Sequence, residues 1–336
     1  MVQAETHGLQ WHWYRITPLH LLLLPLSLLF HFIVALRRRL FRLGLLSSVK
    51  LPVPVIIVGN ITVGGTGKTP LTLYLAEQLL ANGWHPGIIS RGFGGNGNKD
   101  QEVLPGSDPA TAGDEPVLMA QRRLCPVWVG RDRPAAARAL LQAHAECDVI
   151  ISDDGLQHYR LQRDVEIVVV DGIRRFGNGF LLPAGPLREA TSRLREVDAV
   201  VINGGAGSPR GSMAAPGEYS MQLEGVHFYN LLNPEITATA ADFQGQCVHA
   251  IAGIGHPERF FHHLNKLGLT LQAHPYPDHH HFSAADLAYK DANALLMTEK
   301  DAVKCLAYAD EKCWVLRVDA RLDSSLIQLI LKKITP

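Results

Sequence analysis

An apolar run, VPVIIVGN at 53–60, leads directly into the glycine-rich segment ITVGGTGKTP at 61–70. A buried strand, a glycine-rich turn and a helix in that order cradle a polyphosphate with backbone N–H groups. The strict motif has glycine where this chain has Thr62, so VGGTGKT is a relaxed form. Because strand, turn and helix all follow in order, the segment predicts a phosphate loop rather than an incidental turn.

This loop predicts particular roles for its side chains. Lys68 is expected to neutralise the β- and γ-phosphate oxygens of a bound nucleotide, and the Thr69 hydroxyl to bind Mg²⁺. The predicted nucleotide-binding residues are Thr62, Val63, Gly64, Gly65, Thr66, Gly67, Lys68 and Thr69.

Acidic residues elsewhere could complete a magnesium site. VIISDDG at 149–155 places Asp153 and Asp154 at the end of an apolar strand, where the second acid of a nucleotide motif sits. A helix cap or a turn would also explain them. GDEP at 113–116 supplies Asp114 and Glu115, although that tetrapeptide alone fits a solvated turn equally well.

The wider pattern is an alternation of apolar strands with helices. Helix 71–83 follows the first strand, and the predicted strands are 53–60, 85–90, 147–155, 164–171 and 198–203. This order predicts an α/β fold with a doubly wound, mostly parallel sheet, like that of P-loop NTPases. After a Gly/Ser/Pro-rich stretch at 204–218 the alternation restarts, which predicts a second, smaller α/β domain. The predicted units are 1–48, 49–224 and 225–336, the last including a terminal helix.

The first unit carries an uncharged apolar run at 19–36, followed by RRRLFR. As a helix the run would be about 27 Å long, close to the ~30 Å thickness of a bilayer's hydrocarbon core. A cleaved signal peptide does not fit, since no basic region precedes the run. A buried core helix remains open, as does the choice between spanning the membrane and lying in its interface. In either membrane pose, Arg37, Arg38, Arg39 and Arg42 would meet anionic headgroups on the cytoplasmic side.

Composition narrows the classes of partner. The chain has 32 basic and 32 acidic residues, so no global field favours nucleic acid. The five cysteines are odd in number and follow no metal-ligand spacing, which is typical of a reducing compartment. The residues themselves leave two classes open: a partitioning-type ATPase or GTPase that acts with a protein partner, and a small-molecule kinase. A guanine site would require the tetrapeptide Asn/Thr-Lys-x-Asp. In TEKD at 298–301 the lysine comes one position later than in that pattern, so a guanine site is disfavoured.

Taken together, several segments resemble the tetraacyldisaccharide 4′-kinase family from about residue 15 to 325. They are VGNITVGGTGKTP, ISRGFGG, GDEP, DDGLQH, LLPAGPLRE, PDHH with the following FSAADL, and MTEKDAVK. Thr62 fits that family's own variant of the loop. The resemblance implies transfer of the ATP γ-phosphoryl group to the 4′-hydroxyl of a tetraacylated glucosamine disaccharide 1-phosphate, a step that makes lipid IVA in lipid A biosynthesis.

The resemblance also implies site residues. Its catalytic Asp and His match Asp114 and His279, with His280 as the fallback, and Lys68 acts beside them. Thr69, Glu115, Asp153 and Asp154 are the candidate Mg²⁺ ligands. Candidate substrate residues are Arg91, Gln157, His158, Arg188 and Glu189, and Arg174 and Arg175 are further candidates for the 1-phosphate. Since Asp114 and His279 fall in different predicted domains, we expect the site in the cleft between them, assembled when the cleft closes.

The same resemblance implies the partners and the location. ATP and Mg²⁺ are the expected cofactors, and an acylated disaccharide lipid in a bilayer is the expected partner. Neither nucleic acid nor an obligate protein partner is expected. The expected location is the cytoplasmic face of the bacterial inner membrane.

Overall fold

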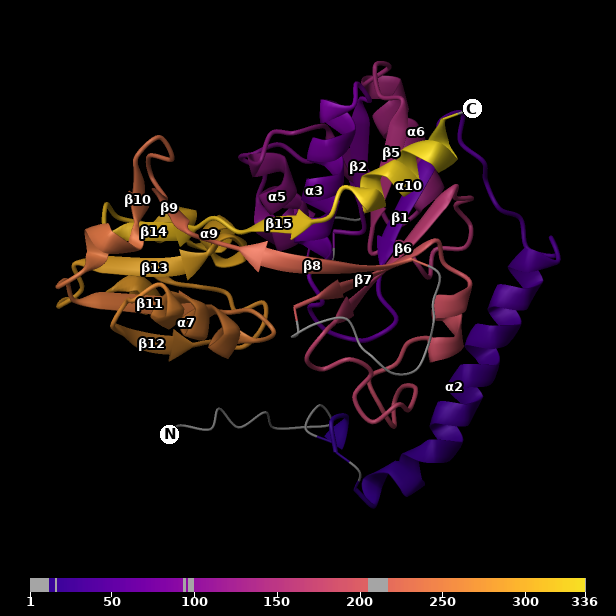
Figure 1. Cartoon of the computed structure of the whole chain (residues 1–336), viewed down its shortest axis with the longest axis horizontal. Helices are drawn as coiled ribbons and strands as arrows, with labels where there is room; N and C mark the ends of the chain where they lie inside the picture. Colours follow the sequence, from indigo (N-terminus) through magenta and orange to yellow (C-terminus); the bar gives the residue numbers. More distant parts are fainter. Residues whose placement is uncertain (1–11, 16, 93–94, 96–99, 205–216, 336) are drawn as a thin grey trace.

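The computed structural model describes residues 12–15, 17–92, 95, 100–204 and 217–335. The first 11 residues of the predicted membrane unit, most of the predicted linker at 204–218 and part of ISRGFGG therefore lie outside the described residues. Two sheets form two lobes, and the long helix α2 (Leu19–Arg42) lies beside the larger lobe (Figure 1).

A nine-stranded sheet forms the larger lobe. Its order is β15 (Asp319–Leu322), β8 (Glu218–Glu224), β7 (Ala199–Asn203), β6 (Val165–Asp171), β1 (Val55–Gly59), β5 (Val149–Asp153), β2 (Pro86–Ser90), β4 (Val127–Val129) and β3 (Gln101–Glu102). The run from β8 to β4 is parallel throughout, and only the edge strands β15 and β3 pair antiparallel. The predicted doubly wound α/β sheet is confirmed.

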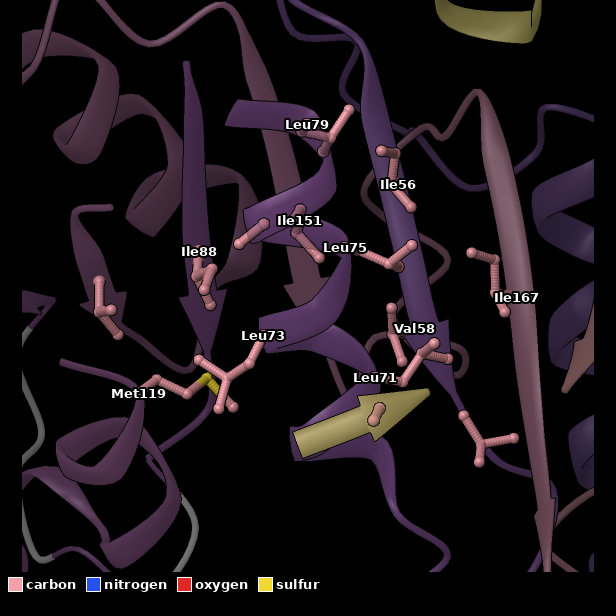
Figure 2. Close-up of a cluster of buried hydrophobic side chains, with 14 of the residues drawn as sticks. Ile56, Val58, Leu71, Leu73, Leu75, Leu79, Ile88, Met119, Ile151 and Ile167 are labelled. Atoms are coloured by element: carbon pink, nitrogen blue, oxygen red, sulfur yellow. The ribbon is translucent and has the colours of Figure 1, made fainter. Parts of the chain in front are cut away.

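The helices of this lobe cover its sheet. They are α3 (Lys68–Ala81), α4 (Pro109–Ala112), α5 (Asp114–Gln121), α6 (Arg133–Ala143), the short 3₁₀ helix η1 (Thr191–Arg195) and the C-terminal α10 (Ser325–Ile334). Leucines of α3 pack against β1, β2 and β5 (Figure 2). Leu71, Leu75 and Leu79 are fully buried, and burying such a side chain stabilises the fold by roughly 1.5–3 kcal/mol. This packing fixes the start of α3, which carries the phosphate loop.

A six-stranded sheet forms the smaller lobe. Its order is β10 (Thr237–Thr239), β9 (His227–Asn230), β14 (Cys313–Leu316), β13 (Ala294–Thr298), β11 (Val248–Ala252) and β12 (Leu271–Pro275). Its helices are α7 (Pro257–Lys266), α8 (Ala284–Leu287) and α9 (Glu299–Cys305), with the 3₁₀ helices η2 (Ala240–Phe243) and η3 (Leu306–Tyr308).

The C-terminal end of the chain differs from the predicted unit 225–336. Strand β15 pairs with β8 in the larger sheet, and the two strands run between the lobes in Figure 1. Helix α10 then buries Leu326, Ile327 and Ile330 in the core of the larger lobe. The sequence predicts an apolar terminal helix, but only packing decides which core it covers.

Candidate active site

The phosphate loop lies between β1 and α3, as predicted. Gly64 and Gly67 have φ of 97° and 95°, a region that favours glycine. A Cβ on Gly67 would also lie 2.4 Å from the side-chain nitrogen of Asn203. That nitrogen donates to the Thr66 carbonyl over 2.9 Å. The loop is therefore held from outside as well as by its own glycines.

Thr62 and Val63 are held by a segment far along the chain. Thr62 forms an antiparallel bridge with Leu187, and the Val63 N–H donates to the Pro186 carbonyl over 2.8 Å. At the position where the strict motif has glycine, this chain therefore uses extended backbone. This pairing explains why a residue with a side chain is accommodated there.

Lys68 and Asp154 form an ion pair at the start of α3. The Lys68 Nζ lies 3.4 Å from one carboxylate oxygen of Asp154, and Arg188 lies 3.3 Å from the other. Burial alone would raise the pKa of Asp154, but the charges of Lys68 and Arg188 outweigh it and lower that pKa to about 2. Asp154 is therefore an ionised counter-ion of the loop lysine.

Asp153 has the opposite electrostatic character. Its side chain is buried, and one oxygen accepts a 3.3 Å hydrogen bond from Thr72. Burial, with the nearby charge of Glu115, raises the pKa of Asp153 to about 7. Among the described residues its other oxygen has no hydrogen-bond partner. An orphaned buried carboxylate oxygen beside a second acid fits a hard cation such as Mg²⁺, with Thr69 one residue after the loop lysine.

Asp114 and His279 meet across the two lobes. Asp114 is the first residue of α5, and His279 lies in the loop after β12 with φ of 60°. The His279 Nδ1 lies 3.1 Å from an oxygen of Asp114. His280, the fallback, lies 3.5 Å from Asp286 of its own lobe instead. The structure thus brings together the two residues that the resemblance matched, already in contact.

Two lysines of α9 surround this pair. Lys304 lies 3.9 Å from Asp114, and Lys300 lies 3.1 Å from Asp278 and 3.4 Å from the His279 Nε2. Burial raises the pKa of Asp114, but the hydrogen bond with His279 and the two lysine charges hold it below the ordinary value. Asp114 is therefore a carboxylate at neutral pH, the form that can accept a proton.

The pair borders both a cavity and the phosphate loop. A cavity of about 520 Å³ is lined by Asp114, His279, Lys304 and parts of segments 105–110 and 306–308. On the other side, a Cβ on Gly255 would lie 3.4 Å from Asp278 and 3.9 Å from the Gly65 nitrogen. The loop that carries His279 therefore approaches the phosphate loop through the turn after β11.

Comparisons with known proteins agree with this geometry. A family model described as tetraacyldisaccharide-1-P 4′-kinase matches residues 19–335. This chain belongs to that family.

Several relatives carry the same name. Proteins called tetraacyldisaccharide 4′-kinase from Methylobacillus flagellatus and Azoarcus sp. are 51% identical over 335 residues and 53% identical over 326 residues. These alignments cover 100% and 96% of this chain, and 98% and 94% of the relatives. The crystal structure of an "apo" form of LpxK from Aquifex aeolicus in complex with ATP matches with a TM-score of 0.82 and 31% identity, covering 94% of this chain and all of that one. The chain is thus a kinase of lipid A biosynthesis, which selects this class over the partitioning-type ATPase.

Two other predicted residues, Glu189 and Gln157, form hydrogen bonds next to the phosphate loop. Glu189 is buried and accepts 2.7 Å hydrogen bonds from Gln157 and from Tyr159. Gln157 also donates to the Asn60 carbonyl, directly before the phosphate loop, over 3.1 Å. Glu189 and Gln157 therefore contact protein groups next to the phosphate loop, and their predicted contact with the substrate stays a prediction.

The predicted basic residues around the site fall into two groups. Arg188 and Arg174 are engaged, with Asp154 and Asp171 respectively, and Arg174 also donates to the Gly65 carbonyl. Arg91, directly after β2, and Arg175, in the loop after β6, are exposed. Burial, together with the charges of Arg133 and Arg91, lowers the pKa of His158 to about 4, so its ring is neutral at pH 7.

Three basic residues near the site, Lys300, Lys304 and Arg133, were not predicted from the sequence. Lys300 and Lys304 lie in MTEKDAVK, and their spacing of four places both on one face of α9, a signal that was available. Arg133 begins α6 and is almost fully buried, donating to the Asp153 carbonyl over 2.7 Å. Burial lowers the pKa of Arg133 to about 10, so it remains a cation at neutral pH. Nothing in the local sequence marks a buried arginine.

Proposed function

We propose that the kinase transfers the γ-phosphoryl group of ATP to the 4′-hydroxyl of a tetraacylated glucosamine disaccharide 1-phosphate at the contact between its two lobes. The observation that carries this proposal is the 3.1 Å contact between Asp114 and His279 beside the phosphate loop. An assay with γ-labelled ATP and the disaccharide lipid tests it. Label should enter the lipid with the wild-type enzyme and not with Lys68→Ala or Asp114→Ala, and ATP hydrolysis that ignores the lipid would contradict it.

The phosphate loop binds the triphosphate in this proposal. Its backbone N–H groups and the positive end of α3 face the phosphates. Lys68 is balanced by Asp154 in the described structure, and the γ-phosphate oxygens replace that partner when ATP binds. Mg²⁺ held by Thr69, Asp153 and Glu115 would neutralise charge on the β- and γ-phosphate oxygens.

Asp114 and His279, which meet between the lobes, activate the acceptor hydroxyl in this proposal. Asp114 accepts the proton of the sugar hydroxyl, and His279 orients or polarises that hydroxyl. General base assistance of this kind typically contributes ~10²–10⁴-fold. Lys300 and Lys304 keep Asp114 ionised for this role. Among the basic candidates for the substrate's 1-phosphate, we favour Arg91 and Arg175, because both side chains are exposed and neither forms an ion pair with a carboxylate of the described residues.

Substituting Asp153 by asparagine should separate stability from activity. The folded protein favours the protonated carboxyl, because its pKa of about 7 lies above the ordinary 3.8. The contribution of Asp153 to the stability of wild type is therefore lost as the pH rises from 3.8 through 7, whereas Asp153→Asn has no such contribution to lose. We expect the variant to raise the melting temperature more at pH 8 than at pH 4, and to lower kinase activity.

The control for that substitution is Glu235→Gln, an exposed carboxylate in the β9–β10 loop, which should change neither quantity. MgCl₂ should stabilise wild type at pH 8 more than it stabilises Asp153→Asn. Equal magnesium effects on both proteins would contradict the assignment of Asp153 as a ligand.

Helix α2 carries the link to the membrane. It is the one helix among the described residues that is long and apolar enough to cross a bilayer. Leu21, Leu22 and Phe32 are each more than 60% exposed. A substrate with four acyl chains stays in the bilayer, since each buried CH₂ contributes ~0.8 kcal/mol. The apolar face of α2 would bring the enzyme to it.

The contacts of α2 favour an interfacial pose over a spanning one. Ser27, in the first half of the helix, donates to the Leu181 carbonyl over 2.8 Å, and His20 lies 2.7 Å from Asn178. Arg38 and Arg42, near its end, both pair with Glu196. A spanning helix would draw this polar flank of the larger lobe into hydrocarbon, which is costly. We infer that α2 lies in the interface of the inner membrane's cytoplasmic leaflet, with Arg37 and Arg39 exposed towards headgroups.

Charging the exposed face of α2 tests this pose. The double variant Leu29→Glu with Phe32→Glu should lower cosedimentation with phospholipid vesicles at least roughly tenfold, because each side chain loses its apolar burial in lipid. Its melting temperature and its affinity for ATP should stay unchanged. Leu232→Glu, an equally exposed leucine in the distant β9–β10 loop, is the matched control. Unchanged vesicle binding by the double variant would contradict the interfacial pose.

A further inference from the structure

A second cluster of ligating side chains lies in the smaller lobe. Cys247 directly precedes β11, His249 is the second residue of β11, and Asp291 precedes β13. One ligating atom from each lies within 4.8 Å of the others. The Cys247 Sγ lies 3.8 Å from the nearer Asp291 oxygen, and the His249 Nε2 lies 3.4 Å from the same oxygen.

The His249 ring is aimed into this cluster. Its side chain is only 2% exposed, and among the described residues its Nε2 has no hydrogen-bond partner. Its Nδ1 lies 3.0 Å from the His274 Nε2 on β12. When Nδ1 carries the proton, its N–H donates a hydrogen bond to the His274 Nε2, and the lone pair of the His249 Nε2 is free to face Cys247 and Asp291. A metal-ligating histidine usually has this arrangement, with the second ring nitrogen held by another group.

We propose that Cys247, His249 and Asp291 bind a zinc ion. A thiolate, an imidazole and a carboxylate form a donor set that suits Zn²⁺, whereas Mg²⁺ and Ca²⁺ require oxygen ligands. A tetrahedral zinc ion with bonds of about 2.0–2.3 Å separates its ligand atoms by roughly 3.3–3.8 Å. The two separations given above, 3.8 and 3.4 Å, lie in that range. Three protein ligands leave the fourth position for water.

The cluster lies away from the contact between the lobes. Cys247 and His249 lie at the amino end of β11, whereas the turn that approaches the phosphate loop follows its carboxyl end at Gly253–Gly255. Asp291 belongs to the segment that joins α8 to β13, and Tyr289 of that segment stacks on His274. The ion ties this segment to β11 and so stabilises the lobe that carries His279. The proposal does not depend on the kinase mechanism.

Cobalt and zinc binding to the full-length protein test the site. Co²⁺ bound to a thiolate gives a ligand-to-metal charge-transfer absorption in the near ultraviolet, which sites made only of histidine cannot give. One equivalent of Co²⁺ should produce that absorption in wild type. Zn²⁺ should displace the Co²⁺, which removes the absorption, and should raise the melting temperature. Cys247→Ser should abolish the absorption, and Asp291→Asn should weaken zinc affinity by at least the roughly 10- to 100-fold that loss of an outer partner costs.

Two further variants sharpen the result. Cys125→Ala removes a cysteine of the larger lobe and should keep the full absorption. His274→Gln should weaken zinc affinity roughly tenfold without abolishing the absorption, because it acts through His249. Absence of the charge-transfer absorption in folded wild type would overturn the proposal, as would its persistence in Cys247→Ser. Because the partly exposed Cys247 and exposed Asp291 tolerate polar substitution, both variants should keep the metal-free melting temperature of wild type.

Discussion

Replacing Asp114 by asparagine is expected to lower the turnover number with the disaccharide lipid by ~10²–10⁴-fold, because an amide cannot accept the hydroxyl proton. Asparagine keeps the volume and can still accept the hydrogen bond from His279, whose Nδ1 lies 3.1 Å from the carboxylate. The KM for ATP should therefore change little. Initial rates with γ-labelled ATP at saturating lipid measure this.

The matched control for this variant is Asp108→Asn. Asp108 lines the same cavity and caps α4, and asparagine caps a helix equally well. It should retain wild-type turnover. His279→Ala should also lose turnover, since it removes the group that orients the hydroxyl. If either Asp114→Asn or His279→Ala turned over at the wild-type rate, the pair between the lobes would not be the catalytic centre.

Replacing Lys68 by alanine is the second large expected effect. Removing one preorganised charge from a developing oxyanion typically lowers the turnover number by ~10²–10³-fold. The affinity for ATP should fall as well, because the loop then presents only backbone groups to the phosphates, while Asp154 keeps Arg188 as its only described ion-pair partner. Turnover and ATP affinity are measured separately, by initial rates and by equilibrium binding.

Two variants calibrate the Lys68 result. Lys50→Ala removes an exposed lysine before β1 and should leave both quantities unchanged. Lys68→Arg keeps the charge but replaces a compact ammonium with a planar fork, so it should restore ATP affinity more than turnover. A Lys68→Ala enzyme with normal ATP affinity and normal turnover would place the triphosphate elsewhere.

Much of the fold could be predicted because its signals are local. The strand, loop and helix of the phosphate site are contiguous, and β2, β5, β6 and β7 are apolar runs near the predicted positions. The fate of the C-terminal segment could not be predicted in this way. Helix α10 is apolar on one face whichever lobe it covers, and only the pairing of β15 with β8 carries it back to the larger sheet.

In the candidate site, too, local sequence predicts which residues are present but not which contacts they form. Adjacent in sequence, Asp153 and Asp154 look equivalent, yet one is buried beside Glu115 and the other is paired with Lys68 and Arg188. Glu189 is predicted as a substrate residue, and no local pattern predicts the hydrogen bonds that it accepts from Gln157 and Tyr159. Cysteine spacing indicated no metal site, because the three proposed zinc ligands come from two segments 42 residues apart at their nearest members, His249 and Asp291.

The sequence by itself determined the phosphate loop, the parallel α/β sheet and the apolar helix, because each depends on neighbouring residues and a short period. The resemblance to a family added the identities of Asp114 and His279. Only the tertiary structure decided which carboxylates are charged, which side chains reach across the lobes and which core the terminal helix covers. The physical reason is that burial and electrostatic pairing depend on distances between segments far apart in the chain, and no local pattern encodes those distances.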